Sequence, residues 1–377
     1  MSTLRYAIIG CGGEIAPQHI KAIAQLPDAQ LAAMADVAVE RGAPRAAEAG
    51  CPFFADYRTL LAETHPDVVV ICTPHPLHAP IAVECLGTGA HVLVEKPIAV
   101  AVAEADAMLA AASASSRLLA VSFQHRFDPA VEAMRRFIAA GELGALVRVE
   151  CVEPWFRPDV YYRSAGWRST WRGEGGGVLL NQAIHTLDVL CYLLGTPESV
   201  LGWIKVAGHA VECEDTAQAM LEYPGGALGT LHVNTVEAGS PRHIQLVGDR
   251  ALLDLTGDDL TITRFAPALS AARREIAEKF GEPASSSERI ALPPSPAFGE
   301  GHALVHRDFF EAIVNGGGPR CDGASGRKSL ELANAITLSS CTQRAVRLPL
   351  DRQAYGALLA ELRAGTHAIP GAIPADI

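Results

Sequence analysis

Hydrophobic and polar positions in the first third of the chain follow one repeating pattern. Short apolar runs rich in Val, Ile and Leu alternate with alanine-rich stretches whose apolar residues recur at helical spacing. This alternation predicts strand–helix–strand units that build a doubly wound parallel sheet. We expect strands at 4–9, 31–35, 67–72, 91–94 and 118–122, and helices between them that include 79–86 and 102–112.

After about residue 124 the pattern changes to a helix followed by many strands. The helix is predicted at 129–140, and the strands at 146–152, 200–206, 216–223, 227–234, 244–247 and 260–264. The segment Tyr223-Pro-Gly-Gly226 between two of these strands has hairpin chemistry, because glycine supplies the positive φ that tight turns require. We therefore expect a large, mostly antiparallel open sheet flanked by helices. Residues 267–296 are expected to form a surface excursion, and helices at 302–314 and 328–342 to close the fold.

The length of 377 residues favours two domains. We place an α/β domain with the parallel sheet at 1–124 and an α+β domain with the antiparallel sheet at 125–377. The second domain is expected to supply the substrate site and the contacts of an oligomer.

Composition and charge argue against several classes of function. No apolar run reaches the roughly 18 residues of a membrane helix, and the first ten residues lack the pattern of a secretion signal. The net charge of −11 argues against nucleic acid as a partner, because such binding needs surplus Lys and Arg. The nine cysteines include no Cys-x-x-Cys pair, so neither a disulfide framework nor a structural zinc site is expected. A metal site at Cys72, His75 and His78 is disfavoured because the sequence offers no second ligand cluster. We expect a cytoplasmic protein with no metal and no membrane partner.

A glycine-rich loop follows the first predicted strand. It reads Gly10-Cys-Gly-Gly-Glu-Ile15 and leads into a helix. Glycines here allow backbone N–H groups at the helix N-terminus to approach a pyrophosphate, although Ile15 occupies the slot of the third glycine in the dinucleotide fingerprint. Asp36 ends the second strand, where a carboxylate accepts hydrogen bonds from both adenosine ribose hydroxyls. The loop and the carboxylate predict a Rossmann domain that binds NAD. NADP is disfavoured because its 2′-phosphate would meet the like charge of Asp36, although Arg41 is a nearby cation that qualifies this preference.

Lys96 follows the fourth predicted strand. This position lies at the carboxyl edge of the parallel sheet, where open α/β sheets bind ligands. Pro97 restricts Lys96 to an extended backbone, which suits a side chain held at one angle. A lone lysine in a strand-end loop is more often a solvated surface charge, so this feature gains weight only from its neighbours.

The run 175–195 is predicted to be a helix that begins at three glycines and ends at Gly195. Asn181, His185 and Asp188 follow i, i+4, i+7 spacing and would share one stripe of this otherwise apolar helix. A buried polar group without a partner costs about 1 to 3 kcal/mol. The stripe must therefore be satisfied internally or line a cavity.

Taken with the motifs 72–78 (CTPHPLH) and 95–97 (EKP), these features resemble the glucose–fructose oxidoreductase / inositol dehydrogenase / rhizopine catabolism protein (Gfo/Idh/MocA) family of NAD(P)-dependent oxidoreductases. The resemblance covers nearly the whole chain. It implies hydride transfer between a substrate carbinol carbon and nicotinamide, with Lys96 as acid/base and His185 assisting at the same oxygen. Many family members carry Asp where this chain has Asn181; Asn cannot take a proton, so its implied role is to orient His185 or a substrate hydroxyl.

The resemblance and the patterns together give the predicted site. Aromatic and arginine residues concentrated at 155–172 suit a sugar ring, although an ordinary aromatic core accounts for them equally well. The predicted catalytic residues are Lys96, His185 and Asn181. The predicted cofactor-binding residues are Gly10, Gly12, Gly13, Ile15, Asp36, Thr73, Pro74, His78, Glu95, Lys96, Pro97 and Gln124. The predicted substrate-binding residues are Lys96, Trp155, Arg163, Trp167, Arg172, Asn181, His185 and Asp188.

We therefore expect an NAD(H)-dependent dehydrogenase that acts on a secondary alcohol or ketone of a sugar, inositol, glycoside or nucleotide-sugar-like substrate. Two alternatives stay open: a redox-neutral, NAD-dependent enzyme that cleaves glycosides, and a non-catalytic NAD-binding sensor. The chain is expected to form a homodimer or homotetramer through the open sheet.

Overall fold

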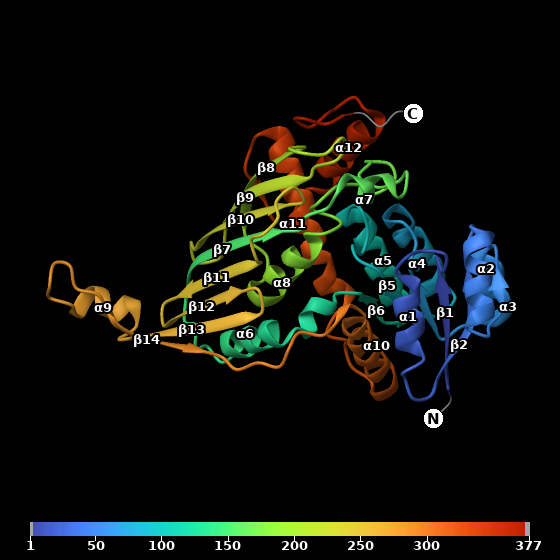
Figure 1. The fold of residues 1–377 in the computed structure, drawn as a ribbon, viewed down its shortest axis with the longest axis horizontal. Coiled ribbons are helices and arrows are strands. Elements are labelled where there is room, and N and C mark those ends of the chain that lie inside the picture. The colour runs from blue at the N-terminus through green and yellow to red at the C-terminus, as the bar shows by residue number, and fades with distance from the viewer. Residues whose placement is uncertain (1–2, 374–377) are drawn as a thin grey trace. The chain divides into compact units, whose positions relative to one another are not determined.

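The computed structural model describes residues 3–373 and divides the chain into two compact units (Figure 1). The first unit runs to Phe127 and includes two later segments, Arg172–Gly175 and Pro296–Leu330. The second unit consists of Asp128–Trp171, Gly176–Ser295 and the described residues from Glu331 to Ile373. The expected boundary after residue 124 lies close to the first division, but the two later segments join the first unit rather than the domain expected at 125–377.

The first unit contains a six-stranded parallel sheet in the order β3-β2-β1-β4-β5-β6. Its strands are β1 (Leu4–Ile9), β2 (Ala29–Ala35), β3 (Phe53–Phe54), β4 (Val68–Ile71), β5 (His91–Val94) and β6 (Leu119–Val121). This is the strand order of a doubly wound dinucleotide-binding fold, which confirms the predicted architecture. The order reverses between β1 and β4, and ligands of such sheets bind at the carboxyl ends of the strands near this reversal. β3, which has two residues, was not predicted from the sequence.

Helices cover this sheet and include one from late in the chain. They are α1 (Ala16–Ile23), α2 (Val39–Glu48), α3 (Tyr57–Thr64), η1 (His75–Leu77), α4 (His78–Gly87), α5 (Val102–Ser115), η2 (Gln124–Phe127) and α10 (Phe298–Asn315). All four residues of β4 are fully buried, as expected for a strand covered on both faces. Val305, Phe309 and Phe310 of α10 belong to the same buried cluster as Ile8 of β1. This burial explains why segment 296–330 folds with the first unit.

The second unit contains a nine-stranded sheet in the order β14-β13-β12-β11-β7-β10-β9-β8-β15. Its strands are β7 (Leu146–Pro154), β8 (Ser199–Lys205), β9 (Thr216–Glu222), β10 (Leu228–Asn234), β11 (His243–Gly248), β12 (Ala251–Thr256), β13 (Asp259–Ala266), β14 (Ala284–Arg289) and β15 (Val346–Arg347). Only the β7–β10 pair is parallel among the described strands of this sheet, so the mostly antiparallel prediction is confirmed. The predicted hairpin joins β9 to β10, with the Tyr223 N–H donating to the Ala227 carbonyl and positive φ at Gly225 and Gly226. β12, β14 and β15 were not predicted.

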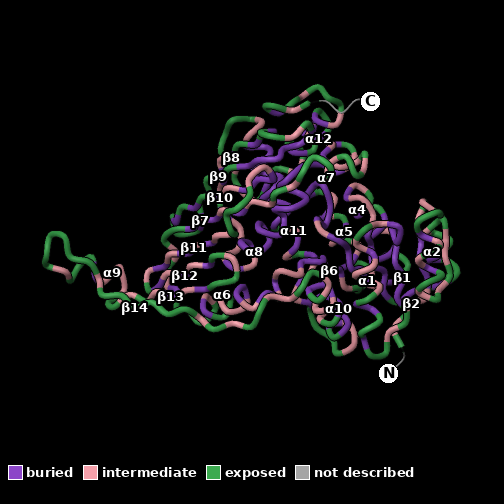
Figure 2. The backbone as a smooth tube through the Cα atoms, in the orientation of Figure 1, coloured by how far each residue is buried: buried purple, intermediate pink, exposed green. Residues whose placement is uncertain are grey.

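Helices of the second unit are α6 (Pro129–Ala139), α7 (Asp159–Arg163), α8 (Ile184–Leu194), α9 (Leu269–Glu275) and α12 (Arg352–Ala364); the division between the units falls within α11 (Gly323–Thr342). The expected excursion at 267–296 carries α9 and β14, and its residues are largely exposed (Figure 2). Within residues 3–373, the structure contains no helix with the length and apolarity needed to cross a membrane.

The predicted helix at 175–195 is wrong in its first half. α8 begins at Ile184, and residues 176–183 form successive turns in which the Ala183 N–H reaches back five residues to the Val178 carbonyl. Asn181 therefore precedes the helix, and the predicted polar stripe is reduced to His185 and Asp188.

Candidate active site

The glycine loop after β1 is shaped by close contact with the end of β4. Gly10 has φ of +87°, and a Cβ on it would lie 2.7 Å from the backbone carbonyl carbon of Cys72 and from the Thr73 nitrogen. Its N–H donates to the Ala35 carbonyl at the end of β2 (2.8 Å). Glycine is required here because a side chain fits neither the backbone angle nor the space. The loop thus lies over the carboxyl ends of β1, β2 and β4.

Asp36 is fixed against this loop. Its Oδ2 accepts the Gly12 N–H at 2.6 Å and its Oδ1 accepts the Ala38 N–H at 2.8 Å. A Cβ on Gly12 would lie 2.8 Å from the same carboxylate oxygen. The Arg45 guanidinium donates to the Cys11 carbonyl (2.6 Å) and to the Gly13 carbonyl. The loop and the carboxylate predicted to hold pyrophosphate and ribose are therefore brought together.

His78 links two loops of the predicted cofactor site. It is fully buried, with Nδ1 2.8 Å from the Pro97 carbonyl and Nε2 2.8 Å from the Thr73 carbonyl. Burial lowers its pKa, so the neutral ring donates to one carbonyl at a time. His78 thus braces the loops that carry Thr73, Pro74 and Pro97, while direct contact with a cofactor stays a prediction. Gln124 lies in η2, where the backbone of α10 approaches it at Gly301.

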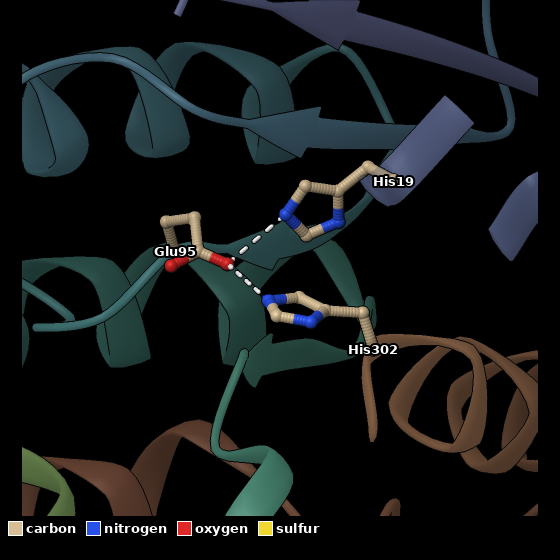
Figure 3. A group of neighbouring side chains, drawn as sticks. All are labelled: His19, Glu95 and His302. Atoms are coloured by element: carbon tan, nitrogen blue, oxygen red, sulfur yellow. Dashed lines mark hydrogen bonds and ion pairs between the residues drawn. The ribbon is translucent and has the colours of Figure 1, made fainter. Parts of the chain in front are cut away.

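Glu95 points into the interior of the first unit (Figure 3). Its Oε1 lies 3.0 Å from His19 Nε2 of α1 and 3.8 Å from His302 Nε2 of α10. The other nitrogen of His19, Nδ1, lies 2.8 Å from His306 Nε2. Lys96, directly after Glu95, is half-buried and its backbone N–H reaches Glu95 Oε2 at 3.2 Å. We call His19, Glu95, His302 and His306 the buried histidine–glutamate network.

Ion pairing explains this network. Burial alone would lower the pKa of His19, but the Cys72 sulfur and the Glu95 carboxylate raise it to about 10. Burial alone would raise the pKa of Glu95, but the hydrogen bond and charge of His19 hold it well below its ordinary range. His19 and Glu95 are therefore a charged pair near neutral pH. Atoms of His19, Glu95 and His302 lie within 4.8 Å of one another, a spacing compatible with a metal. Because the two charged groups bond directly at 3.0 Å, we assign an ion pair to His19 and Glu95.

In the second unit, Glu214 holds the turns before α8. Its Oε1 accepts the N–H groups of Gly177 (3.0 Å) and Leu179 (3.1 Å), and its backbone carbonyl accepts the Val178 N–H (2.8 Å). A Cβ on Gly177 would lie 1.8 Å from that carbonyl oxygen. Gly177 therefore allows a close backbone approach to Glu214 just before Asn181 and His185, rather than the start of a helix.

The phenol oxygen of Tyr161 is the shared hydrogen-bond acceptor of three polar side chains. Arg168 donates to it at 2.7 Å, and the amides of Asn181 and Gln182 donate at 3.1 Å each. Tyr161 lies in the aromatic stretch 155–172 considered for a sugar ring, but it was not selected as a site residue, and its contacts with Asn181 and Gln182 were not predicted because only the fold brings α7 beside residues twenty positions later. Asn181 thus orients Tyr161 in this structure; a contact of Asn181 with His185 or substrate stays a prediction.

The other predicted substrate residues differ in their burial and in the side chains that they contact. The rings of Trp155 and His185 lie 6.3 Å apart between centroids. Asp188 is buried within α8, and Arg168 stacks over the Trp167 ring at 4.8 Å. Arg163 is exposed and faces Asp159 at 3.8 Å, outside the Tyr161 cluster. Arg172 is exposed and belongs to the first unit.

Comparisons with known proteins agree with both units. Residues 4–123 match a family described as an oxidoreductase family with an NAD-binding Rossmann fold, and residues 131–254 match the GFO/IDH/MocA C-terminal domain. Trans-1,2-dihydrobenzene-1,2-diol dehydrogenase of Mus musculus is 31% identical over 60% of this chain and 67% of its own. Levoglucosan dehydrogenase of Pseudarthrobacter phenanthrenivorans is 26% identical over 93% of this chain and 99% of its own. The WlbA dehydrogenase of Bordetella pertussis, solved with NADH and UDP-GlcNAcA, superimposes with a TM-score of 0.78 at 28% identity over 93% of this chain and all of that one.

Proposed function

Because the chain belongs to the Gfo/Idh/MocA family of oxidoreductases, we propose that it transfers a hydride between a nicotinamide and a secondary alcohol or ketone of a sugar-like substrate. The chain is an NAD-dependent dehydrogenase that acts on CH–OH groups. The sugar-like class of substrate is supported by relatives named for levoglucosan, inositol and glucosides.

Lys96 is the acid/base of this proposal. The observation that carries it is the position of Lys96 directly after β5, at the sheet edge where the glycine loop and Asp36 also lie. NAD⁺, which the glycine loop and Asp36 would hold, would supply the acceptor for the hydride that leaves the carbinol carbon in oxidation. The hydroxyl proton passes to the Lys96 amine, and the C=O bond forms. His185 hydrogen-bonds the same oxygen, and Asn181 with Tyr161 orients the neighbouring hydroxyls.

A substrate screen tests the activity directly. NADH formation is followed by absorbance with inositols, free sugars, glycosides and nucleotide sugars. We expect NADH to accumulate with at least one polyhydroxylated alcohol. Cleavage of a glycoside with no net NADH would instead identify the redox-neutral alternative, and binding of NAD without turnover of any compound would favour the sensor.

Asp36 is expected to set the choice of cofactor. Replacing Asp36 by Ala removes the carboxylate proposed to hold the ribose hydroxyls, so the Kd for NAD⁺ should rise about 10-fold, as for loss of a charged hydrogen bond. The preference for NAD⁺ over NADP⁺ should fall by at least a similar factor, because like-charge repulsion is also removed. Fluorescence titration with NADH and NADPH measures both. Glu40→Ala, which removes one exposed carboxylate from α2, is the matched control and should leave both Kd values unchanged. An unaltered NADPH Kd in the Asp36 variant would count against this role.

We also propose that the chain forms a homodimer or homotetramer through the open face of the nine-stranded sheet. Trp203 of β8 and Met220 of the adjacent β9 are 53% and 48% exposed, and apolar side chains gathered on one face favour association. Trp203→Glu is expected to convert the oligomer to monomers in analytical ultracentrifugation. Phe280→Glu, in the exposed excursion, should leave the assembly intact.

All nine cysteines are free, which supports a reducing compartment such as the cytoplasm.

A further inference from the structure

Glu95 presents a difficulty for an acid/base at Lys96. A carboxylate close to an amine stabilises the protonated amine and raises its pKa, typically by 1 to 3 units within about 4 to 6 Å. Glu95 is adjacent to Lys96 in the chain, and their charges interact. An unpaired Glu95 would therefore hold the Lys96 proton and oppose its release during turnover.

His19 supplies the positive charge that pairs with the Glu95 carboxylate. The two side chains are buried and bonded at 3.0 Å. A protonated imidazole has two N–H donors, and both have acceptors here: Nε2–H donates to Glu95 Oε1, and Nδ1–H donates to His306 Nε2 at 2.8 Å. The geometry thus matches a His19 cation and a Glu95 anion whose charges largely cancel at a distance.

Besides the Cys72 sulfur beside His19, the titratable side chains that face this pair and Lys96 among the described residues include histidines from three other elements. They are His75 of η1, His78 of α4, and His302 and His306 of α10. Burial lowers the pKa of each of them, so they are neutral near pH 7. His302 donates its Nδ1–H to the Phe298 carbonyl at 3.0 Å, which suits the neutral ring. None of these four rings therefore duplicates the charge of His19.

We propose that His19 is a positioning residue that keeps Glu95 from acting as the counter-ion of Lys96, so that the amine can exchange its proton with substrate. This inference rests on the proposed function, in which Lys96 is the acid/base. His19 lies 77 positions before Lys96 and acts on it only through Glu95. The carboxylate in turn orders the loop through the Lys96 N–H.

A second substitution distinguishes an effect of charge on Lys96 from a general disturbance of the structure. His19→Gln leaves Glu95 unpaired, so titration of the Lys96 amine should move upward by about one pH unit. Adding Glu95→Gln removes the carboxylate and should return the titration to within about 0.3 unit of the original, since the region is then neutral again. Glu95→Gln alone should also lie close to the original value. His306→Gln is the matched control: it alters a hydrogen bond of His19 and leaves both charges in place.

Two measurements read this titration. The first is the pH dependence of Lys96 acetylation by acetic anhydride, quantified by mass spectrometry, which needs no turnover. The second is the acidic limb of the pH profile of kcat/KM, which should shift by the same amount as the acetylation curve. An unchanged labelling curve in His19→Gln, or a shifted curve that Glu95→Gln fails to restore, would overturn the proposal.

His19→Asn provides a second neutral replacement should the glutamine variant fail to fold, and unfolding midpoints are recorded for every variant. The two proposals can fail separately. If Lys96 is not the acid/base, the labelling curves still report whether His19 masks Glu95, whereas the kcat/KM limb will not follow them.

Discussion

Replacement of Lys96 by Met is expected to lower kcat/KM for the preferred alcohol about 10³-fold. Methionine keeps an aliphatic chain of similar length but cannot accept the hydroxyl proton, and general acid/base groups typically contribute 10² to 10⁴ in rate. Binding of NADH, measured by fluorescence, should change less than about threefold, because the glycine loop and Asp36 are untouched. The loss should appear in kcat and be accompanied by loss of the acidic limb of the pH profile.

Lys21→Met is the matched control for this substitution. Lys21 is an exposed lysine of α1, so the same change of charge there should leave the kinetics unaltered. Turnover by the Lys96 variant at the original rate would remove Lys96 from the mechanism. Loss of NADH binding in parallel with activity would show that the lysine holds cofactor rather than protons.

Gly177→Ala is expected to destabilise the second unit by more than about 4 kcal/mol, a size reserved for severe backbone or core clashes. The new Cβ would lie 1.8 Å from the Glu214 carbonyl oxygen and 2.8 Å from its carbonyl carbon. This neighbour is backbone that also bonds to Val178, so it cannot move aside as a flexible side chain would. Thermal unfolding followed by calorimetry should show a markedly lower transition, and the residual activity should be very small because Asn181 and His185 follow the displaced turns.

Gly356→Ala offers a control of opposite sign. Gly356 is exposed within α12 and a Cβ there meets nothing within 4 Å, so alanine should raise stability by about 0.5 to 1 kcal/mol. Equal stability of the two alanine variants would contradict the close approach at Gly177.

Strand positions in the first unit were predictable because buried parallel strands are continuous apolar runs. β1 and β5 have the bounds expected for them, 4–9 and 91–94. The glycine loop and Asp36 were also predictable, since their spacing follows from one strand–turn–helix unit. Alternating strands and hairpin glycines likewise gave the second sheet, apart from β12, β14 and β15.

The remaining features depend on contacts between distant parts of the chain. The apolar composition of 178–195 favours helix throughout, but Glu214, 37 residues from Gly177, captures the N–H groups of its first turns. The buried histidine–glutamate network joins His19 to His306 across 287 residues, and no local pattern marks such a pair. The same holds for α10, whose apolar face fits the core of the first unit although its sequence position follows the second sheet.

The network changes the interpretation of the Glu95-Lys96-Pro97 motif. Glu95 was expected to bind cofactor, yet its side chain is committed to His19 in the interior. We therefore propose that Glu95 contributes to the cofactor site indirectly. Its carboxylate bonds the Lys96 backbone N–H, and its charge affects the protonation of the Lys96 amine.

The central proposal is that the Lys96 amine and the His185 imidazole act on one substrate oxygen beside the nicotinamide. A crystal structure with NADH and a hydroxylated substrate analogue tests it most directly. We expect both nitrogens to lie within about 3.2 Å of the same oxygen, whose carbon faces the nicotinamide C4. A substrate oxygen contacted by neither group, or a nicotinamide directed away from Lys96, would contradict it.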